Sequence, residues 1–238
     1  MYVAQNKLEK SFQLFILLKF FYPNGKAKLE RIERYSLLNQ LPYKDIRTLN
    51  NTVKHLEQIG WLRQNTTTGY YHIVSIHRLR ELYKWNSRAA ITVNFKELPS
   101  MDAILGSAIY TYLHMAFWRK VRKVKRVRLK GRTYQFYRPS FGSHNQFAPV
   151  ATTGVKALFG ISPKKASYLK HQAAKKGYLI IKKDYDPVPY SYSTIQRMIR
   201  TESIDPNVRK INGKYQLQLI DLILPHKELV ILKKIKRG

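Results

Sequence analysis

The pattern of apolar and polar positions in residues 161–181 (ISPKKASYLKHQAAKKGYLII) predicts a turn, a helix, a glycine stop and a strand. Ala166, Leu169 and Ala173 fall at helical spacing and form one narrow apolar face. Because these residues are small or aliphatic, this face can lie close against a neighbouring element. The other positions are mostly basic, and we expect them to point outward: Lys164, Lys165, Lys170, His171, Lys175 and Lys176.

The ends of this helix are marked by residues with known conformational preferences. Ser162 is suited to the N-cap and Pro163 to the first turn. Gly177 is suited to the position after the last turn, and residues 178–181 predict a strand that becomes basic at residues 182–183. A basic helix followed by a short strand is typical of the recognition helix and wing of a winged helix-turn-helix.

A similar pattern occurs upstream, in residues 46–62 (IRTLNNTVKHLEQIGWL). A shift of 117 positions places Gly60 on Gly177. The same shift places three inward-facing positions on those of the second helix: Leu49 on Ala166, Thr52 on Leu169 and Leu56 on Ala173. Two copies in one chain predict tandem winged helices.

The remaining pattern predicts the elements that surround these two helices. Further helices are expected at residues 7–21, 28–38, 76–85, 101–118, 150–159 and 193–200, a hairpin at 63–75 and a strand at 90–95. Asn212-Gly213 is a strong hairpin signal. We therefore predict a helix-rich α+β fold, with two winged helix-turn-helix domains in tandem and a small C-terminal β extension. The expected ranges are 1–98, 99–190 with a basic arm at 119–132, and 191–238.

The charge of the chain indicates what kind of partner the protein binds. Lys and Arg number 44 against 14 Asp and Glu, which gives a net charge of +30. Such an excess indicates a polyanionic partner, with nucleic acid favoured over an anionic membrane or an acidic protein. Residues 12–22 are apolar, but Lys19 interrupts them and they are too short to cross a bilayer. A cytoplasmic protein of a bacterial host, encoded by a bacterium, phage or plasmid, is expected.

The densest charge run lies at residues 119–132 (RKVRKVKRVRLKGR) and contains no acid. Its basic residues are Arg119, Lys120, Arg122, Lys123, Lys125, Arg126, Arg128, Lys130 and Arg132. Its pattern fits both a continuation of the preceding helix and a strand. We interpret it as an arm that follows phosphates, or else as a solvated loop in the free protein. Residues 133–148 are expected to be a loop whose aromatic side chains pack beneath the arm or stack on unpaired bases.

The candidate DNA contacts follow from the two helices and their wings. In the first helix and wing they are Lys44, Arg47, Thr48, Asn50, Asn51, Lys54, His55, Arg63, Gln64 and Asn65. In the second they are Ser162, Lys164, Lys165, Ser167, Tyr168, Lys170, His171, Lys175, Lys182 and Lys183. Arg47, Asn50 and Asn51 are the side chains best able to read base edges. The second helix is rich in lysine, so we expect it to contribute more affinity than sequence choice.

Motifs for catalysis are missing from the sequence. It contains no phosphate-binding loop, no dinucleotide fingerprint and no histidine pair at metal spacing, and it has no cysteine. A tyrosine nucleophile stays open because the chain has 17 tyrosines, but the Arg/His constellation of a recombinase cannot be assembled. We therefore expect no enzymatic activity, no metal and no cofactor.

The segments Gly160-Ile161-Ser162 and Gly177-Tyr178-Leu179 resemble helix-turn-helix proteins encoded by phages and mobile elements. The tandem arrangement is similar to plasmid and phage replication initiators of the two-winged-helix type, and to phage transcription regulators. This resemblance implies binding to double-stranded DNA, with replication or transcription proteins as further partners and an open oligomeric state. A nonspecific packaging or structural protein is the alternative, and a DNA-processing enzyme comes third.

Overall fold

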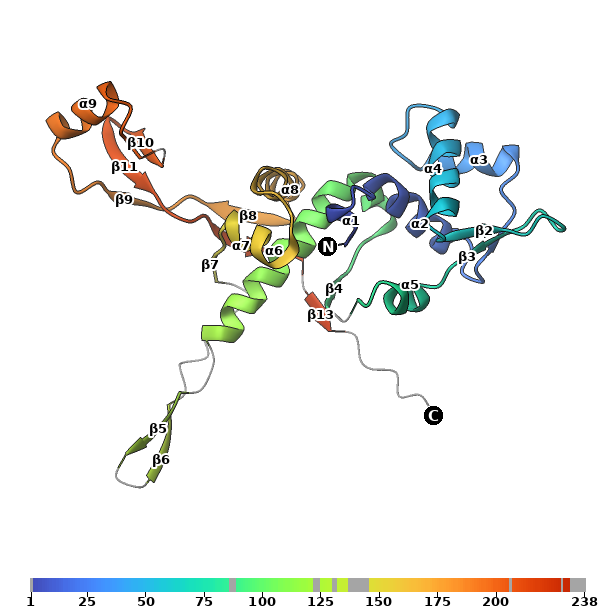
Figure 1. Ribbon diagram of the computed structural model, residues 1–238, viewed down its shortest axis with the longest axis horizontal. Coiled ribbons are helices and arrows are strands. Elements are labelled where there is room, and N and C mark those ends of the chain that lie inside the picture. The colour runs from blue at the N-terminus through green and yellow to red at the C-terminus, as the bar shows by residue number, and fades with distance from the viewer. Residues whose placement is uncertain are drawn as a thin grey trace.

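The computed structural model describes residues 2–85, 89–121, 125–129, 132–136, 146–205, 207–227 and 229–231, without the side chains of residues 120–145 and 231. The chain forms an elongated mixed α+β molecule with small antiparallel sheets (Figure 1). An N-terminal unit, residues 2–85, lies at one end. A C-terminal unit, residues 101–227, begins with a long central helix and continues to the opposite end.

The N-terminal unit is built from helices that cover a three-stranded sheet. Its elements are α1 (Tyr2–Gln5), α2 (Glu9–Phe21), β1 (Lys26–Ala27), α3 (Arg31–Leu38), α4 (Ile46–Gln58), β2 (Leu62–Gln64), β3 (Tyr71–Ile73) and α5 (Ile76–Leu82). The strand order is β1-β3-β2, and both pairings are antiparallel. Phe15, Leu49, Leu56 and Trp61 are fully buried and form its core.

Local chemistry fixes both ends of helix α4. The Asp45 carboxylate accepts a hydrogen bond from the backbone N–H of Thr48 at 2.7 Å, which caps the first turn. Gly60 follows the helix with φ of +72°, a left-handed conformation that glycine adopts without strain. Trp61 then enters the core, and its indole N–H donates to the Tyr83 hydroxyl at 2.9 Å.

The C-terminal unit starts with the longest helix. Its main elements are α6 (Met101–Val121), β5 (Lys125–Leu129), β6 (Arg132–Phe136), β7 (Ala148–Pro149), α7 (Thr152–Phe159), α8 (Pro163–Lys175), β8 (Leu179–Lys182) and β12 (Leu222–Pro225). Strands β7, β12 and β8 form an antiparallel sheet in that order. Strands β5 and β6 form a hairpin that extends from the end of α6 (Figure 1).

The two units repeat one order of elements. Each has a long helix, a short strand, two further helices and two more strands, once the β5–β6 hairpin and residues 185–218 of the C-terminal unit are set aside as insertions. In both units the last of these strands is the middle one of the sheet. Both bounds of α8 lie 117 positions after those of α4 (163 minus 46 and 175 minus 58). Gly60 and Gly177 both have φ of +72°. The predicted correspondence of the two helices is therefore confirmed, including burial of Ala166, Leu169 and Ala173.

Helices α6 and α8 cross at very short distance, as the small-residue face of α8 indicated. Gly106 of α6 lies against the backbone of Leu169, so that a Cβ at residue 106 would overlap the carbonyl oxygen and lie 2.7 Å from the carbonyl carbon. The buried hydroxyl of Tyr110 donates to the Ala166 carbonyl at 3.2 Å. This crossing fixes the position of α8 on α6.

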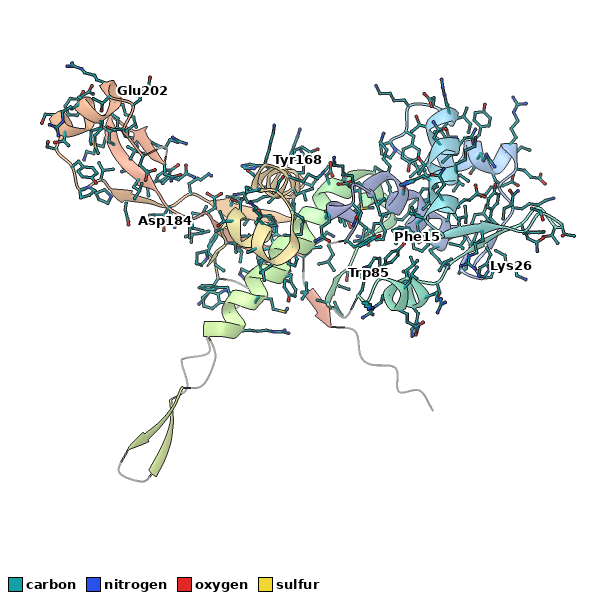
Figure 2. All side chains as sticks on the ribbon, in the orientation of Figure 1. Phe15, Lys26, Trp85, Tyr168, Asp184 and Glu202 are labelled. Carbon is teal, nitrogen blue, oxygen red and sulfur yellow. The ribbon has the colours of Figure 1, made fainter. Side chains whose placement is uncertain are left out.

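A long insertion separates β8 from β12. We call residues 185–218 the distal arm; it contains β9 (Tyr185–Pro187), α9 (Tyr192–Arg200), β10 (Val208–Ile211) and β11 (Lys214–Gln218). Its sheet has the order β10-β11-β9, and Asn212-Gly213 forms the predicted hairpin turn. The arm projects beyond the rest of the C-terminal unit, and Asp184 marks its base (Figure 2).

The last described strands pair with earlier parts of the chain, namely the sheet of the C-terminal unit and the connector between the two units, residues 89–100. Strand β12 pairs with β7 and β8, and β13 (Leu229–Ile231) pairs with β4 (Ala89–Ile91). The connector continues as a 3₁₀ helix, η1 (Phe95–Ser100). The Glu97 carboxylate in η1 accepts a hydrogen bond from Lys227 at 2.8 Å. Burial of Tyr178 and its hydrogen bond to Glu97 raise the pKa of that tyrosine to about 12.

The basic run 119–132 combines both conformations that the sequence left open. Helix α6 continues to Val121, and β5 occupies residues 125–129. Residues 122–124 and 130–131 lie outside the described part of the chain. The expectation of a loop from residue 133 is wrong for its first residues, because β6 extends to Phe136 through antiparallel pairing with β5.

Candidate nucleic-acid interface

One face of α4 carries polar side chains that are free to meet a ligand. Arg47, Asn51 and Lys54 are exposed and follow one another at intervals of four and three residues, which places them on the same side of the helix. Lys44 is exposed just before the helix begins. The opposite side carries the buried Leu49 and other core residues. The arrangement gives a stripe of one amide between two cations.

Three other candidates on α4 are held by the protein itself. Asn50, predicted as a base reader, is only partly exposed, and its side-chain oxygen accepts from Nη1 of Arg34 at 2.7 Å. His55 shares a 2.7 Å hydrogen bond with the Ser11 hydroxyl. Thr48 is also partly buried. These contacts position α4 on α2 and α3, a role that residue type alone does not indicate.

The loop between β2 and β3 projects away from the N-terminal unit (Figure 1). Arg63 and Gln64 at the end of β2 and Asn65 at the start of the loop are all exposed. The side-chain oxygen of Asn65 accepts from the backbone N–H groups of Thr67 and Thr68, each at 3.0 Å. Asn65 therefore shapes the tip of the loop, while Arg63 and Gln64 are available for contacts.

Helix α8 carries a second exposed stripe, longer than that of α4. Lys164, Tyr168, His171 and Lys175 lie at intervals of four, three and four residues, and all are exposed. Figure 2 labels Tyr168 on α8, and its hydroxyl contacts Asp102 in the first turn of α6. Ser162 is the N-cap of the helix, because its side chain accepts from the Lys165 N–H at 3.3 Å. His171 donates to the backbone carbonyl of Ser167 at 2.8 Å, and Ser167 itself is partly exposed.

The outward position predicted for Lys170 is wrong. Only 4% of Lys170 is exposed, and its ammonium group forms an ion pair with Asp221, which precedes β12. Lys183 pairs with the same carboxylate at 2.8 Å. Burial alone would raise the pKa of Asp221, but the two ammonium groups lower it below its usual value. Lys170 therefore ties α8 to the residue before β12 and is closed to an external ligand.

Lys165 links α8 to the N-terminal unit. Its ammonium nitrogen lies 3.0 Å from Oε1 of Glu9 in α2 and 3.5 Å from Oδ1 of Asp102 in α6. Tyr168 donates to Oδ2 of the same aspartate at 2.8 Å. Burial lowers the pKa of Lys165, but Glu9 and Asp102 outweigh it and the net shift is upward. Asp102 also raises the pKa of Tyr168 through this hydrogen bond.

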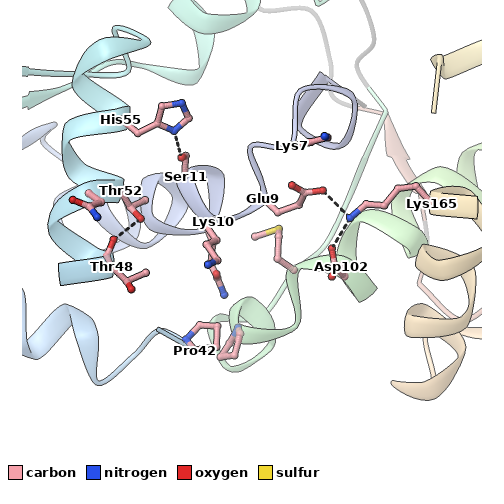
Figure 3. A pocket seen from close by; sticks show the side chains of 14 residues that line it. Lys7, Glu9, Lys10, Ser11, Pro42, Thr48, Thr52, His55, Asp102 and Lys165 are labelled. Atoms are coloured by element: carbon pink, nitrogen blue, oxygen red, sulfur yellow. Dashed lines mark hydrogen bonds and ion pairs between the residues drawn. The ribbon is translucent and has the colours of Figure 1, made fainter. Parts of the chain in front are cut away.

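A groove with a volume of about 670 Å³ lies between the two units (Figure 3). We call it the inter-unit groove. Residues of α4 line one side, Asp102 and Lys165 line the other, and the start of α2 lies between them. Its lining includes Lys7 and Lys10, which the sequence analysis missed. In the sequence, Lys7 and Lys10 are ordinary polar positions at the start of the helix predicted at residues 7–21, and nothing distinguishes them from other solvent-facing lysines.

The remaining basic candidates lie toward the ends of the C-terminal unit. Arg119 is exposed near the end of α6, and Lys182 is exposed at the end of β8. The side chains of the other basic residues in the predicted arm lie outside the described part of the chain: Lys120, Arg122, Lys123, Lys125, Arg126, Arg128, Lys130 and Arg132. The backbone of β5 and β6 nevertheless shows that this run includes a hairpin.

Within the ranges that the structure describes, no three His, Asp or Glu side chains come together as they would to hold a metal ion. Among the described helices, none combines the length and the apolar character needed to cross a membrane.

Comparisons of the chain with family models, with curated proteins and with solved structures gave no significant match.

Proposed function

We propose that this protein binds double-stranded DNA through two winged helix-turn-helix units, with α4 and α8 as recognition helices. The observation that carries the proposal is the repeated order of elements, with matching strand orders β1-β3-β2 and β7-β12-β8. In both units the helix before the second strand exposes a polar stripe on the side away from its core. Winged helices place this helix in a major groove.

The charge of the chain supports a polyphosphate partner. A net charge of +30 produces self-repulsion, which the negative phosphates of DNA would offset. Binding would also release the counterions that are condensed on the DNA. On α4 the exposed Asn51 lies between Arg47 and Lys54. An asparagine amide can bond both N6 and N7 of adenine, and the flanking cations can bind guanine or phosphate. Helix α4 is therefore the sequence-reading helix of the proposal.

Elements outside the two helices extend the contact along the backbone. Strand β2, which follows α4, presents the exposed Arg63 and Gln64. Strand β5 of the β5–β6 hairpin lies in the run at 119–132, which has nine basic residues and no acid. Contacts of this kind hold a protein on duplex DNA without reading sequence. They suit a replication initiator or a transcription regulator of a phage or mobile element, acting in the cytoplasm of a bacterial host.

Nonspecific packaging of nucleic acid is the second candidate, and one observation favours it. The exposed stripe of α8 consists of Lys164, Tyr168, His171 and Lys175, without Asn, Gln or Arg. Lysine acts mainly as a point charge toward phosphate, so this helix supplies affinity more readily than discrimination. In that case the protein would bind all duplexes with similar strength.

Selection of bound fragments from a pool of random duplexes tests the proposal. We expect one enriched motif, and gel shifts in which unlabelled motif competes far better than scrambled duplex of equal length. Enrichment without any motif, and equal competition by both duplexes, would favour packaging. Failure to bind any duplex at low salt would contradict both candidates.

A further inference from the structure

The inter-unit groove lies between the two helices that the proposed function assigns to major grooves. One wall is formed by Thr48, Asn51 and His55 of α4, and the other includes Asp102 and Lys165 (Figure 3). A duplex that contacted both helices at once would span the part of the molecule where this groove lies. Its chemistry therefore bears on how one ligand reaches both units.

Two lysines in the groove have no acidic partner among the residues that the structure describes. Lys7 and Lys10 are both exposed and lie on the short segment where α1 ends and α2 begins. Lys7 has φ of +56°, which is uncommon for a residue with a side chain. The buried Tyr43 donates its hydroxyl proton to the Lys10 carbonyl at 2.7 Å. The backbone that carries both ammonium groups is thus held in place.

The two carboxylates in the groove are already engaged. Glu9 and Asp102 both face Lys165, at 3.0 and 3.5 Å, and Asp102 also accepts from Tyr168. Their charges are therefore directed at α8. The cationic character of Lys7 and Lys10 remains available to an anion that enters from solvent.

We propose that the inter-unit groove receives the phosphodiester backbone of the duplex where it crosses between α4 and α8, with Lys7 and Lys10 as its phosphate contacts. This inference rests on the proposed function. Two adjacent major grooves on one side of a duplex are separated by a minor groove and its two backbones. A protein with a helix in each must accommodate backbone phosphates between them. The location and charge of the two lysines match that requirement.

A matched pair of double variants tests the inference on the full chain. The test variant is Lys7→Gln with Lys10→Gln. The control is Arg78→Gln with Lys84→Gln, on or just after α5, which lies on the other side of the N-terminal unit from α4 (Figure 1). Each pair removes two exposed charges, and each includes one lysine with positive φ, +56° at Lys7 and +52° at Lys84. Thermal unfolding of both variants checks that they fold alike.

Affinity for one selected duplex is measured from 50 to 200 mM salt. Each lost phosphate contact lowers the slope of log affinity against log salt by about 0.9, so the test variant should lose about 1.8. Over this fourfold rise in salt it should therefore lose about 12-fold less affinity than the unaltered protein. The control should keep the original slope. Ethylation of phosphates at the centre of the site should interfere with binding of the unaltered protein and not of the test variant.

The other outcomes separate the inference from the proposal on which it rests. If the unaltered protein binds duplex with a steep salt dependence and the test variant keeps that slope, the groove does not hold the backbone. Equal loss in test and control variants would show a general charge effect and would also overturn it. If the unaltered protein does not bind duplex, the proposed function itself fails.

Discussion

The crossing of α6 and α8 predicts a large effect of one methyl group. In Gly106→Ala the new Cβ would overlap the Leu169 carbonyl oxygen and lie 2.7 Å from its carbon, whereas real Cβ contacts essentially never fall below 3.0 Å. The obstacle is helix backbone, which cannot rotate away as a side chain can. Overpacking of this kind costs about 1–3 kcal/mol, and the strained geometry points to the upper end. The better helix propensity of alanine returns about 1 kcal/mol, so we expect a net loss of about 2 kcal/mol.

Urea unfolding followed by circular dichroism measures this loss. With a slope near 2 kcal/mol/M, a loss of about 2 kcal/mol lowers the midpoint by about 1 M. Gly154→Ala is the matched control, because Gly154 is also helical but nothing lies within 4 Å of its added Cβ. That variant should be unchanged or more stable by up to about 1 kcal/mol. If Gly106→Ala were as stable as Gly154→Ala, the close crossing that positions α8 would be wrong.

The structure makes four further predictions. Asp221→Asn leaves the buried Lys170 without its counter-charge and should cost about 3–5 kcal/mol in urea unfolding. The pKa of Asp221 is lowered from 3.8 in the folded state. The stabilisation that its charge gives the fold is therefore complete above about pH 4, and it is lost as the pH falls through the pKa of the folded state. The difference between unaltered protein and Asp221→Asn should therefore shrink in acid. Asp45→Ala removes the cap of α4 and should cost about 1 kcal/mol. Asn51→Ala should reduce discrimination between motif and scrambled duplex by about 1–3 kcal/mol, whereas Lys54→Ala should weaken binding to both equally and lower the salt slope by about 0.9. Competition gel shifts that show equal effects of these two variants would contradict the roles given to them.

Local sequence signals were sufficient for the two helices and their ends. Small or aliphatic residues at helical spacing, a capping Ser or Asp and a following glycine act over one or two turns, so Leu49 and Ala166 could both be placed in a core. The repeat at 117 positions survives in the structure because both copies use the same local chemistry.

Contacts between distant residues were not visible in the pattern. Lys170 has the sequence environment of an outward lysine, and its partner Asp221 lies 51 residues later, beyond the distal arm. Gly106 lies within an apolar helix whose neighbour could not be known. The return of β12 between β7 and β8 was hidden as well, because 39 residues separate Lys182, the last residue of β8, from Leu222, the first residue of β12 (222 minus 183).

In the candidate interface, too, some features follow from local sequence and others depend on contacts between distant residues. Exposure of Arg47, Asn51 and Lys54 follows from helical spacing alone. The engagement of Asn50 by Arg34 and of Lys165 by Glu9 requires the packing of one helix on another. Lys7 and Lys10 became candidate phosphate contacts only from the structure, which places them in the groove between α4 and α8.

The central claim is that both helices bind one duplex side by side. Hydroxyl-radical footprinting on the selected site tests it most directly, with unaltered protein, Asn51→Ala and the double variant Lys164→Gln with Lys175→Gln. We predict one asymmetric protected region, from which the first variant loses protection at one end and the second at the other end. A two-fold symmetric footprint, or loss at the same positions in both variants, would contradict the account.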